Sequence, residues 1–244
     1  SPLKAINRSN VSTLHSAWTW SLPNGPNQAP PIVHDGVLFV YSFGDKVQAL
    51  DAVTGDLLWQ YNRRLPAGTT ASLKRGISIF GSRLYVPTSD LHIVALDVKT
   101  GKVVWDHAIG DSASGMRLTG GTLIARGKVM VGTTGRAPGG NNIVALDAET
   151  GREAWRFNTI AQPGERGGDT WNGLPREQRN GGSVWIPGSY DPVHNLAFFA
   201  PVFPRMGETV YQLTNIGRSE PARSLFEPPA DYKTVDARGP MPRK

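Results

Sequence analysis

Few residues in this chain have the types and spacing that enzyme chemistry requires. The 244 residues include no cysteine, so disulfides, thiol catalysis, zinc-thiolate sites and covalently attached c-type haem are excluded within the chain. The histidines show no paired metal-ligand spacing and are interpreted as turn and strand-end residues. They are His15, His34, His92, His107 and His194. The chemistry of the chain must therefore be sought in its other side chains and in the elements that position them.

The charge pattern gives little support to nucleic-acid binding. The chain has 26 Lys and Arg residues against 20 Asp and Glu residues, a formal net charge of +6. The basic residues are scattered and form no stripe with interleaved aromatic residues, as a nucleic-acid surface would require. No apolar run approaches the roughly 18 residues of a membrane span. The first four residues are no signal peptide, and export is left open.

One phrase of eleven residues occurs three times and organises the chain. The copies start at residues 49, 95 and 145 and share the pattern Ala-Leu-Asp-x-x-Thr-Gly-x-x-x-Trp. Each predicts a strand end, a tight turn and a second short strand that ends at a tryptophan. Glycine suits the turn because it takes positive φ without a Cβ clash, and the Asp and Thr side chains can bond to the turn backbone. A period of 46 and then 50 residues favours propeller blades.

The strand and turn signals predict an all-β chain that contains an incomplete β-propeller. The 28 glycines and 19 prolines exceed average usage and favour short strands joined by many turns. Apolar runs of four or five residues suit strands buried between neighbouring blades, and the repeat tryptophans are expected to pack there. The predicted blades span residues 31–59, 75–105 and 118–155, with a fourth opening at 181–199 and a closing strand before residue 22.

Three full blades plus parts of two others do not close a ring, since closed propellers need at least about four. We therefore predict two regions. Residues 1–203 form the partial propeller, and residues 204–244 form an irregular, proline-rich tail outside the repeat pattern.

The repeat resembles the tryptophan-docking motif of the pyrroloquinoline quinone (PQQ)-dependent alcohol dehydrogenases, which are eight-bladed quinoprotein propellers. Several further motifs occur in the order expected for the N-terminal half of that propeller. They are Lys74-Arg75-Gly76-Ile77, Arg117-Leu118-Thr119-Gly120-Gly121, Gly132-Thr133-Thr134-Gly135, Gly181-Gly182-Ser183-Val184-Trp185 and Gly188-Ser189-Tyr190-Asp191-Pro192. The repeat alone is less specific, because cofactor-free propellers such as outer-membrane assembly scaffolds use similar phrases.

The resemblance implies a set of cofactor-binding residues. PQQ is a flat tricyclic o-quinone with three carboxylates. Trp185 matches the tryptophan whose indole forms the floor under the ring, and Arg75 matches an arginine that engages quinone or carboxylate oxygens. Thr119, Thr134 and Ser183 match hydroxyls that donate to the carboxylates, and Gly135 allows a close backbone approach.

The chain also departs from the family pattern. The family holds calcium or a lanthanide, partly through a glutamate just after the Gly135 position, where this chain has Arg136-Ala137. An asparagine ligand would fall near Phe203, and a glutamate near the start of blade one is replaced by Asn27 or is absent. Thr69-Thr70 lie where the family has a vicinal disulfide. The expected metal ligands are therefore not found, and no metal site is assigned.

The resemblance implies a PQQ-dependent dehydrogenase that oxidises an alcohol or sugar by hydride transfer to the quinone and passes electrons to a periplasmic acceptor. The catalytic aspartate of the family lies beyond the matching region, so no catalytic residue is assigned; Asp231 and Asp236 lack any blade context. The polypeptide is therefore expected to be a truncated form that is weakly active or inactive. The alternative is a non-enzymatic propeller scaffold or protein-binding segment. If a ring forms, another copy or a second chain is expected to complete it.

Overall fold

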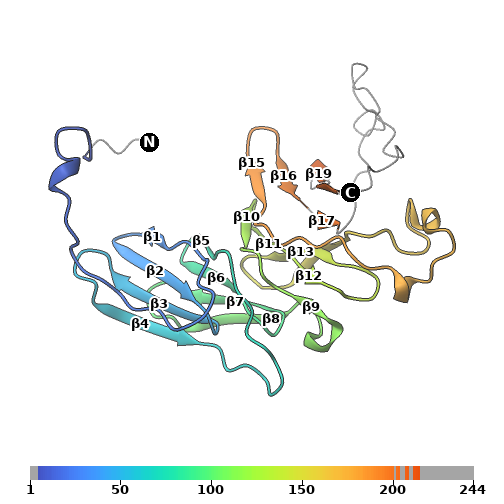
Figure 1. Cartoon of the computed structure of the whole chain (residues 1–244), viewed down its shortest axis with the longest axis horizontal. Coiled ribbons are helices and arrows are strands. Elements are labelled where there is room, and N and C mark those ends of the chain that lie inside the picture. The colour runs from blue at the N-terminus through green and yellow to red at the C-terminus, as the bar shows by residue number, and fades with distance from the viewer. Residues whose placement is uncertain (1–4, 201, 204–206, 209–210, 215–244) are drawn as a thin grey trace, which may run out of the picture.

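The computed structural model describes residues 5–200 and, after them, the strand backbone at residues 202–203, 207–208 and 211–214 (Figure 1). The described part is all-β apart from short 3-10 turns. These turns are η1 (Val11–Thr13), η2 (Ser112–Ser114), η3 (Gly168–Trp171) and η4 (Arg176–Gln178). None of the helical segments in this part of the chain is long and apolar enough to cross a bilayer.

Three antiparallel sheets of four strands follow one another along the chain and lie in sequence order in space (Figure 1). The first contains β1 (Ile32–His34), β2 (Val37–Ser42), β3 (Lys46–Asp51) and β4 (Leu57–Asn62). The second contains β5 (Ser78–Phe80), β6 (Arg83–Pro87), β7 (His92–Asp97) and β8 (Val103–Ala108). The third contains β10 (Leu123–Ala125), β11 (Lys128–Gly132), β13 (Asn142–Asp147) and β14 (Glu153–Asn158). The three predicted blades are confirmed as open, partial propeller sheets.

The fourth sheet continues beyond the point where the repeat pattern ends in sequence. It has the strand order β15 (Ser189–Asp191), β16 (Leu196–Phe199) and β19 (Tyr211–Thr214). Strand β19 therefore lies inside the range 204–244 that was expected to be irregular, because Phe199 and its neighbours in β16 find a pairing partner there. Residues 215–244 of that range lie outside the described residues.

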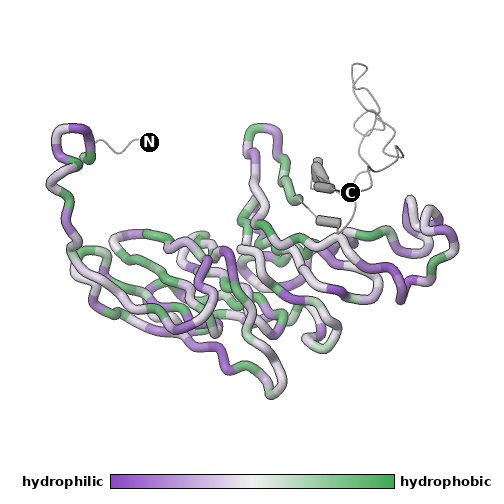
Figure 2. Tube along the Cα trace, in the orientation of Figure 1, coloured by the Kyte–Doolittle hydropathy of each residue, from purple (hydrophilic) through white to green (hydrophobic). Residues whose placement is uncertain are grey.

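Two further pairs of short strands connect the sheets. Strand β9 (Met116–Arg117) pairs with β12 (Thr134–Gly135), and β17 (Val202–Phe203) pairs with β18 (Gly207–Glu208). The N-terminal segment is described from residue 5 to β1 without a strand, so the closing strand predicted before residue 22 is not formed there. Figure 2 shows that the long loop between β14 and β15 carries mostly hydrophilic residues.

The repeated turns have the chemistry that their sequence predicts. In the first copy the Asp51 carboxylate accepts hydrogen bonds of 2.8 Å from the backbone N–H groups of Val53 and Thr54, and Gly55 has φ of +80°. The third copy repeats this arrangement. A hydrogen bond from Lys128, together with the backbone N–H of Thr150, lowers the pKa of Asp147 to about 2. Each turn thus places its second strand, and the tryptophan on it, at a fixed position.

Three tryptophans each dock onto the repeated turn of the sheet that follows them in the chain. The indole N–H groups of Trp18, Trp59 and Trp105 donate to the carbonyls of Ala52, Val98 and Ala148 at 3.3, 2.9 and 3.1 Å. The rings also lie over the turn glycines: a Cβ on Gly55, Gly101 or Gly151 would stand 2.5–2.8 Å from the ring below it. The prediction that the repeat tryptophans pack between blades is confirmed.

The tryptophan of the third repeat is different. The indole nitrogen of Trp155 is buried and has no hydrogen-bond partner among the residues that the structure describes. Its ring packs beside the cluster of buried residues between the third and fourth sheets.

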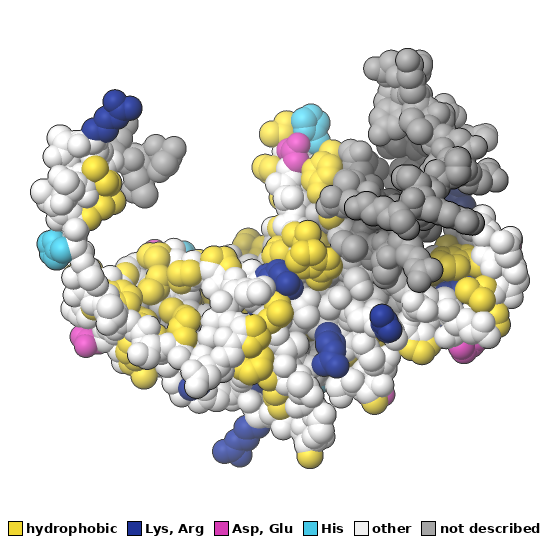
Figure 3. All heavy atoms as spheres, in the orientation of Figure 1, with side chains coloured by type: hydrophobic (Ala, Val, Ile, Leu, Met, Phe, Trp, Pro, Cys, Tyr) yellow, Lys and Arg dark blue, Asp and Glu magenta, His cyan; other side chains and the backbone are white. Residues whose placement is uncertain are grey.

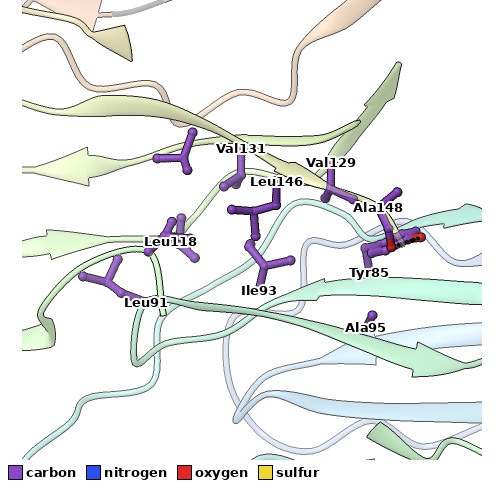
Figure 4. Packing of buried hydrophobic residues seen from close by; sticks show 11 residues of the cluster. Tyr85, Leu91, Ile93, Ala95, Leu118, Val129, Val131, Leu146 and Ala148 are labelled. Atoms are coloured by element: carbon purple, nitrogen blue, oxygen red, sulfur yellow. Dashed lines mark hydrogen bonds between the residues drawn. The ribbon is translucent and has the colours of Figure 1, made fainter. Parts of the chain in front are cut away.

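The hydrophobic core lies between the sheets rather than within any one of them. The cluster between the second and third sheets brings Tyr85 and Ile93 from β6 and β7 against Val131 and Leu146 from β11 and β13 (Figure 4). Equivalent clusters join the first sheet to the second and the third to the fourth. Because strands such as β7 are buried along four successive residues, they read as continuous apolar runs.

Replacing Gly101 with alanine is expected to lower the free energy of unfolding by about 2–3 kcal/mol, because the new Cβ would overlap the Trp59 ring and because φ of +67° is strained for alanine. Gly127→Ala is the matched control. Gly127 has φ of +69° and open space around the Cβ position, so only the strain of about 1 kcal/mol is expected. Urea denaturation measures both values, and equal losses would show that Trp59 does not dock on Gly101.

Candidate functional site

Three of the predicted site residues lie in the segments that lead into the first strands of successive sheets. Arg75 precedes β5, Thr119 precedes β10 and Trp185 precedes β15, so each lies in the segment that enters a sheet and not in a strand. The Arg75 Nη1 donates to the backbone carbonyl of Thr119 at 3.2 Å. The Arg75 guanidinium carbon also lies 4.5 Å from the centroid of the Trp185 ring. The structure therefore brings residues from three sheets into direct contact.

Small residues allow these entering segments to approach closely. A Cβ on Gly121 would stand 3.0 Å from the Cα of Gly76, so the backbones of the second and third sheets nearly touch there. A Cβ on Gly132 would stand 2.3 Å from side-chain atoms of Val184, at the junction with the fourth sheet. Glycine at these positions sets the spacing between the segments that carry Arg75, Thr119 and Trp185.

The other predicted site residues form a second group beside the first. Thr134 and Gly135 form β12, and the N–H of Gly135 donates to the Ser183 hydroxyl at 3.3 Å. The backbone N–H of Val184 donates to the Thr133 carbonyl at 2.9 Å, which ties the fourth-sheet entry to the third sheet. A Cβ on Gly135 would stand 2.2 Å from the Gly115 carbonyl oxygen, so no larger residue fits.

Asn141 was not among the predicted site residues, yet it holds the second group together. Its fully buried side chain donates through Nδ2 to the carbonyls of Gly135 and Gly181, at 2.9 and 2.7 Å. The same amide lies 3.4 Å from the Ser183 hydroxyl. The only sequence signal was its place after two glycines in a loop, where a polar residue is expected to face solvent.

A buried ion pair supports the first group and was also missed. Lys74, which directly precedes Arg75, places its Nζ 3.1 Å from Oδ1 of Asp45, and the Asp45 side chain is fully buried. The Lys74 Nζ also donates to the Ser72 carbonyl at 3.0 Å and to the Ser89 hydroxyl at 2.9 Å. Burial lowers the pKa of the Lys74 ammonium, and the Asp45 charge opposes that shift.

The described donor set suits a flat anion. Trp185 is 36% exposed, the Arg75 guanidinium lies over one part of its ring, and the Ser183 hydroxyl lies two residues before it in the chain. A planar guanidinium and hydroxyl groups are suitable donors for the oxygens of a quinone or a carboxylate. The residues present therefore fit PQQ as a stacked and hydrogen-bonded molecule.

The same residues do not fit the metal ion of the family. Ala137 is buried and offers no side-chain oxygen, and its neighbour Arg136 is a cation. No group of three or more His, Cys, Asp or Glu side chains suited to a metal occurs in the part of the chain that the structure describes. Ca²⁺ requires six to eight oxygen ligands, and nearby guanidinium groups repel it. On the face shown in Figure 3, several basic side chains lie along the middle and others at the upper-left tip and the lower edge, whereas the few acidic ones lie near the edges.

Comparison with known proteins identifies the family. Residues 1–206 match the PQQ family described as the β-propeller domain of glucose, ethanol and alcohol dehydrogenases. The chain belongs to this family. The match covers the first three sheets, all six predicted site residues and the start of the fourth sheet.

Relatives of this PQQ-family chain are longer proteins. It is 37% identical to quinohemoprotein alcohol dehydrogenase ADH IIB of Pseudomonas putida, over 81% of this chain and 31% of that protein. It is 36% identical to the dehydrogenase subunit of an alcohol dehydrogenase (quinone) of Gluconobacter oxydans (strain 621H), over 81% of this chain and 30% of that protein. The chain therefore spans about a third of the length of the curated relatives it matches.

The solved structures agree with the fold of this PQQ-family chain. The structure of quinohemoprotein alcohol dehydrogenase from Comamonas testosteroni superposes with a TM-score of 0.69 at 27% identity. The match covers 82% of this chain and 33% of that one. The open sheets of this chain correspond to a portion of a quinoprotein propeller.

Proposed function

We propose that this chain provides the cofactor floor of a PQQ-dependent dehydrogenase that oxidises an alcohol or a sugar. The observation that carries the proposal is the Arg75 guanidinium held over the partly exposed indole of Trp185, where three successive sheets meet. Membership of the PQQ family supports this function, as do the names of the relatives. A non-enzymatic scaffold would need neither residue at this junction.

Each of the predicted site residues would make a different contact with PQQ. PQQ, when bound, would supply an o-quinone that accepts a hydride from the alcohol carbon. Trp185 would support the flat ring through its indole face, and Arg75 would donate to quinone or carboxylate oxygens. The hydroxyls of Thr119, Thr134 and Ser183 would donate to carboxylates, and Gly135 would let the ligand approach the backbone.

We also propose that the isolated chain has little or no activity. The described residues include no assigned catalytic base, so we expect the isolated chain to turn over substrate weakly or not at all. Completion of the ring would need further propeller sequence, from a second copy or another chain. The proposed location is the periplasm, where an electron acceptor would reoxidise the cofactor.

Titration of the purified chain with PQQ tests whether Trp185 and Arg75 bind the cofactor. Saturable quenching of tryptophan fluorescence is expected for the natural sequence, and Trp185→Ala and Arg75→Ala are each expected to weaken binding at least about tenfold, because they remove the stacking face and a charged donor. The outcome that contradicts the proposal is the absence of saturable binding, with or without Ca²⁺ or La³⁺.

A second arginine–tryptophan pair gives a matched control. The Arg179 guanidinium lies 5.5 Å from the centroid of the Trp171 ring, in the loop between β14 and β15. Trp171→Ala removes a similar aromatic face outside the proposed floor and is expected to leave PQQ affinity unchanged. Equal losses in Trp171→Ala and Trp185→Ala would assign the effect to general destabilisation.

A further inference from the structure

A polar pocket lies beside the proposed floor, and none of the residues that line it belongs to the proposed cofactor-binding set. Its volume is about 250 Å³, and it is formed by the loop of residues 67–70, by Ser89 and by the segment of residues 112–117. We call it the loop pocket. Arg117, at its edge, pairs in register with Thr134 across strands β9 and β12. The loop pocket therefore adjoins one of the proposed cofactor hydroxyls.

The loop pocket carries an uncompensated positive charge. The Arg117 side chain is exposed and makes no ion pair or side-chain hydrogen bond with the described residues. No acidic side chain lines the pocket. Asp111, the acidic residue nearest in sequence, instead accepts a hydrogen bond of 2.8 Å from the backbone N–H of Ala113. A guanidinium among the residues that line a polar pocket favours a carboxylate, which it can bind through two parallel hydrogen bonds.

The wall of the pocket adds uncharged donors. The hydroxyls of Thr69, Thr70 and Ser112 line the pocket and make no hydrogen bonds with the described residues. Behind them, the Ser89 hydroxyl accepts from Lys74, whose charge is balanced by Asp45. A ligand that combined a carboxylate with hydroxyl groups would therefore meet Arg117 at one end and free hydroxyl groups along the wall.

We propose that the loop pocket binds a carboxylate of a hydroxylated or quinonoid anion, with Arg117 as its ion-pairing partner. The carboxylate belongs either to the flat cofactor or to a substrate that is itself a hydroxy acid. The inference rests on the proposed function only in naming these two sources. The Arg117 guanidinium would then supply a positive charge beside the proposed cofactor site, where the ligands for a metal ion are lacking among the described residues.

Two matched ligand pairs test the carboxylate and separate its sources. PQQ is compared with its trimethyl ester, and gluconate with the neutral polyol sorbitol, by titration calorimetry of the full chain. In at least one pair the acid is expected to bind at least about tenfold more tightly, and Arg117→Gln is expected to remove that preference. Arg152→Gln, which removes an exposed arginine in a repeat turn outside the pocket and the proposed site, is the control and should retain it.

The outcomes of this experiment can be told apart from those of the PQQ titration of the Trp185 and Arg75 variants. A preference in the PQQ pair assigns the carboxylate to the cofactor, and a preference in the gluconate pair assigns it to the substrate, even if PQQ does not bind. The proposal is overturned if neither pair shows a preference for the acid, or if the preference survives Arg117→Gln. PQQ binding that needs Trp185 but not Arg117 would leave the floor intact and remove only the loop pocket.

Discussion

Replacing Lys74 with methionine is expected to lower the free energy of unfolding by about 3–5 kcal/mol. The Lys74 side chain is 4% exposed, and its Nζ lies 3.1 Å from Oδ1 of the fully buried Asp45. Methionine has a similar length but would leave the Asp45 carboxylate buried without its counter-ion, and such a charge is costly. Urea denaturation followed by tryptophan fluorescence measures the loss.

Two further variants separate the charge effect from the loss of a side chain. The double variant Asp45→Asn with Lys74→Met removes both charges of this pair, so it is expected to be more stable than Lys74→Met alone. Lys99→Met removes an exposed lysine in a repeat turn and should cost no more than about 0.5 kcal/mol. A loss in Lys74→Met as small as that in Lys99→Met would show that the ion pair is not buried in the native protein.

The Lys74–Asp45 ion pair matters for the proposed site because it connects the first sheet to the residue before Arg75. Asp45 comes from the turn between β2 and β3, and it also accepts hydrogen bonds from the Tyr41 hydroxyl at 2.8 Å and from the backbone N–H of Ser89. Burial and the neighbouring Asp45 charge raise the pKa of Tyr41 well above its usual value. The first and second sheets thus share one polar network that ends at Lys74. Because Arg75 directly follows Lys74 in the chain, this network helps to hold Arg75 in place over Trp185.

The sheets and their tryptophan contacts could be predicted because their causes are local. A Thr-Gly turn after an aspartate forms from hydrogen bonds within a few residues, as the contacts of Asp51 show. Three copies of the turn at nearly equal spacing then require three equivalent sheets. The contact of Trp59 with the next turn also follows, since each turn presents a glycine without a Cβ where the ring arrives.

The polar contacts between sheets could not be predicted in the same way. Lys74 and Asp45 lie 29 positions apart, and Asn141 bonds to Gly181 across 40 positions, so no short pattern connects them. Each is a polar residue in or next to a loop, where exposure is the usual outcome. Strand β19 was missed for a related reason, because its pairing with β16 depends on distant neighbours and not on a repeat turn.

Replacing Asn141 with alanine is expected to lower the free energy of unfolding by about 3–4 kcal/mol and to weaken PQQ binding about tenfold. The substitution leaves the carbonyls of Gly135 and Gly181 buried without the amide that bonds to both, and each unsatisfied group costs about 1–3 kcal/mol. PQQ affinity should fall because Gly135 and Ser183 would no longer be held at a fixed spacing. Denaturation and the PQQ titration measure the two effects on the same preparation.

Asn158→Ala provides the control for this substitution. Asn158 is a half-buried asparagine on β14 that bonds to the side chains of Asn142 and Glu165, away from the proposed floor, so a loss below about 1 kcal/mol and unchanged PQQ affinity are expected. If Asn141→Ala lost stability but kept full PQQ affinity, Asn141 would serve only the packing of the sheets. A parallel loss of both would mean that the same buried amide joins the third and fourth sheets and sets the distance between Gly135 and Ser183, which we propose bind the cofactor.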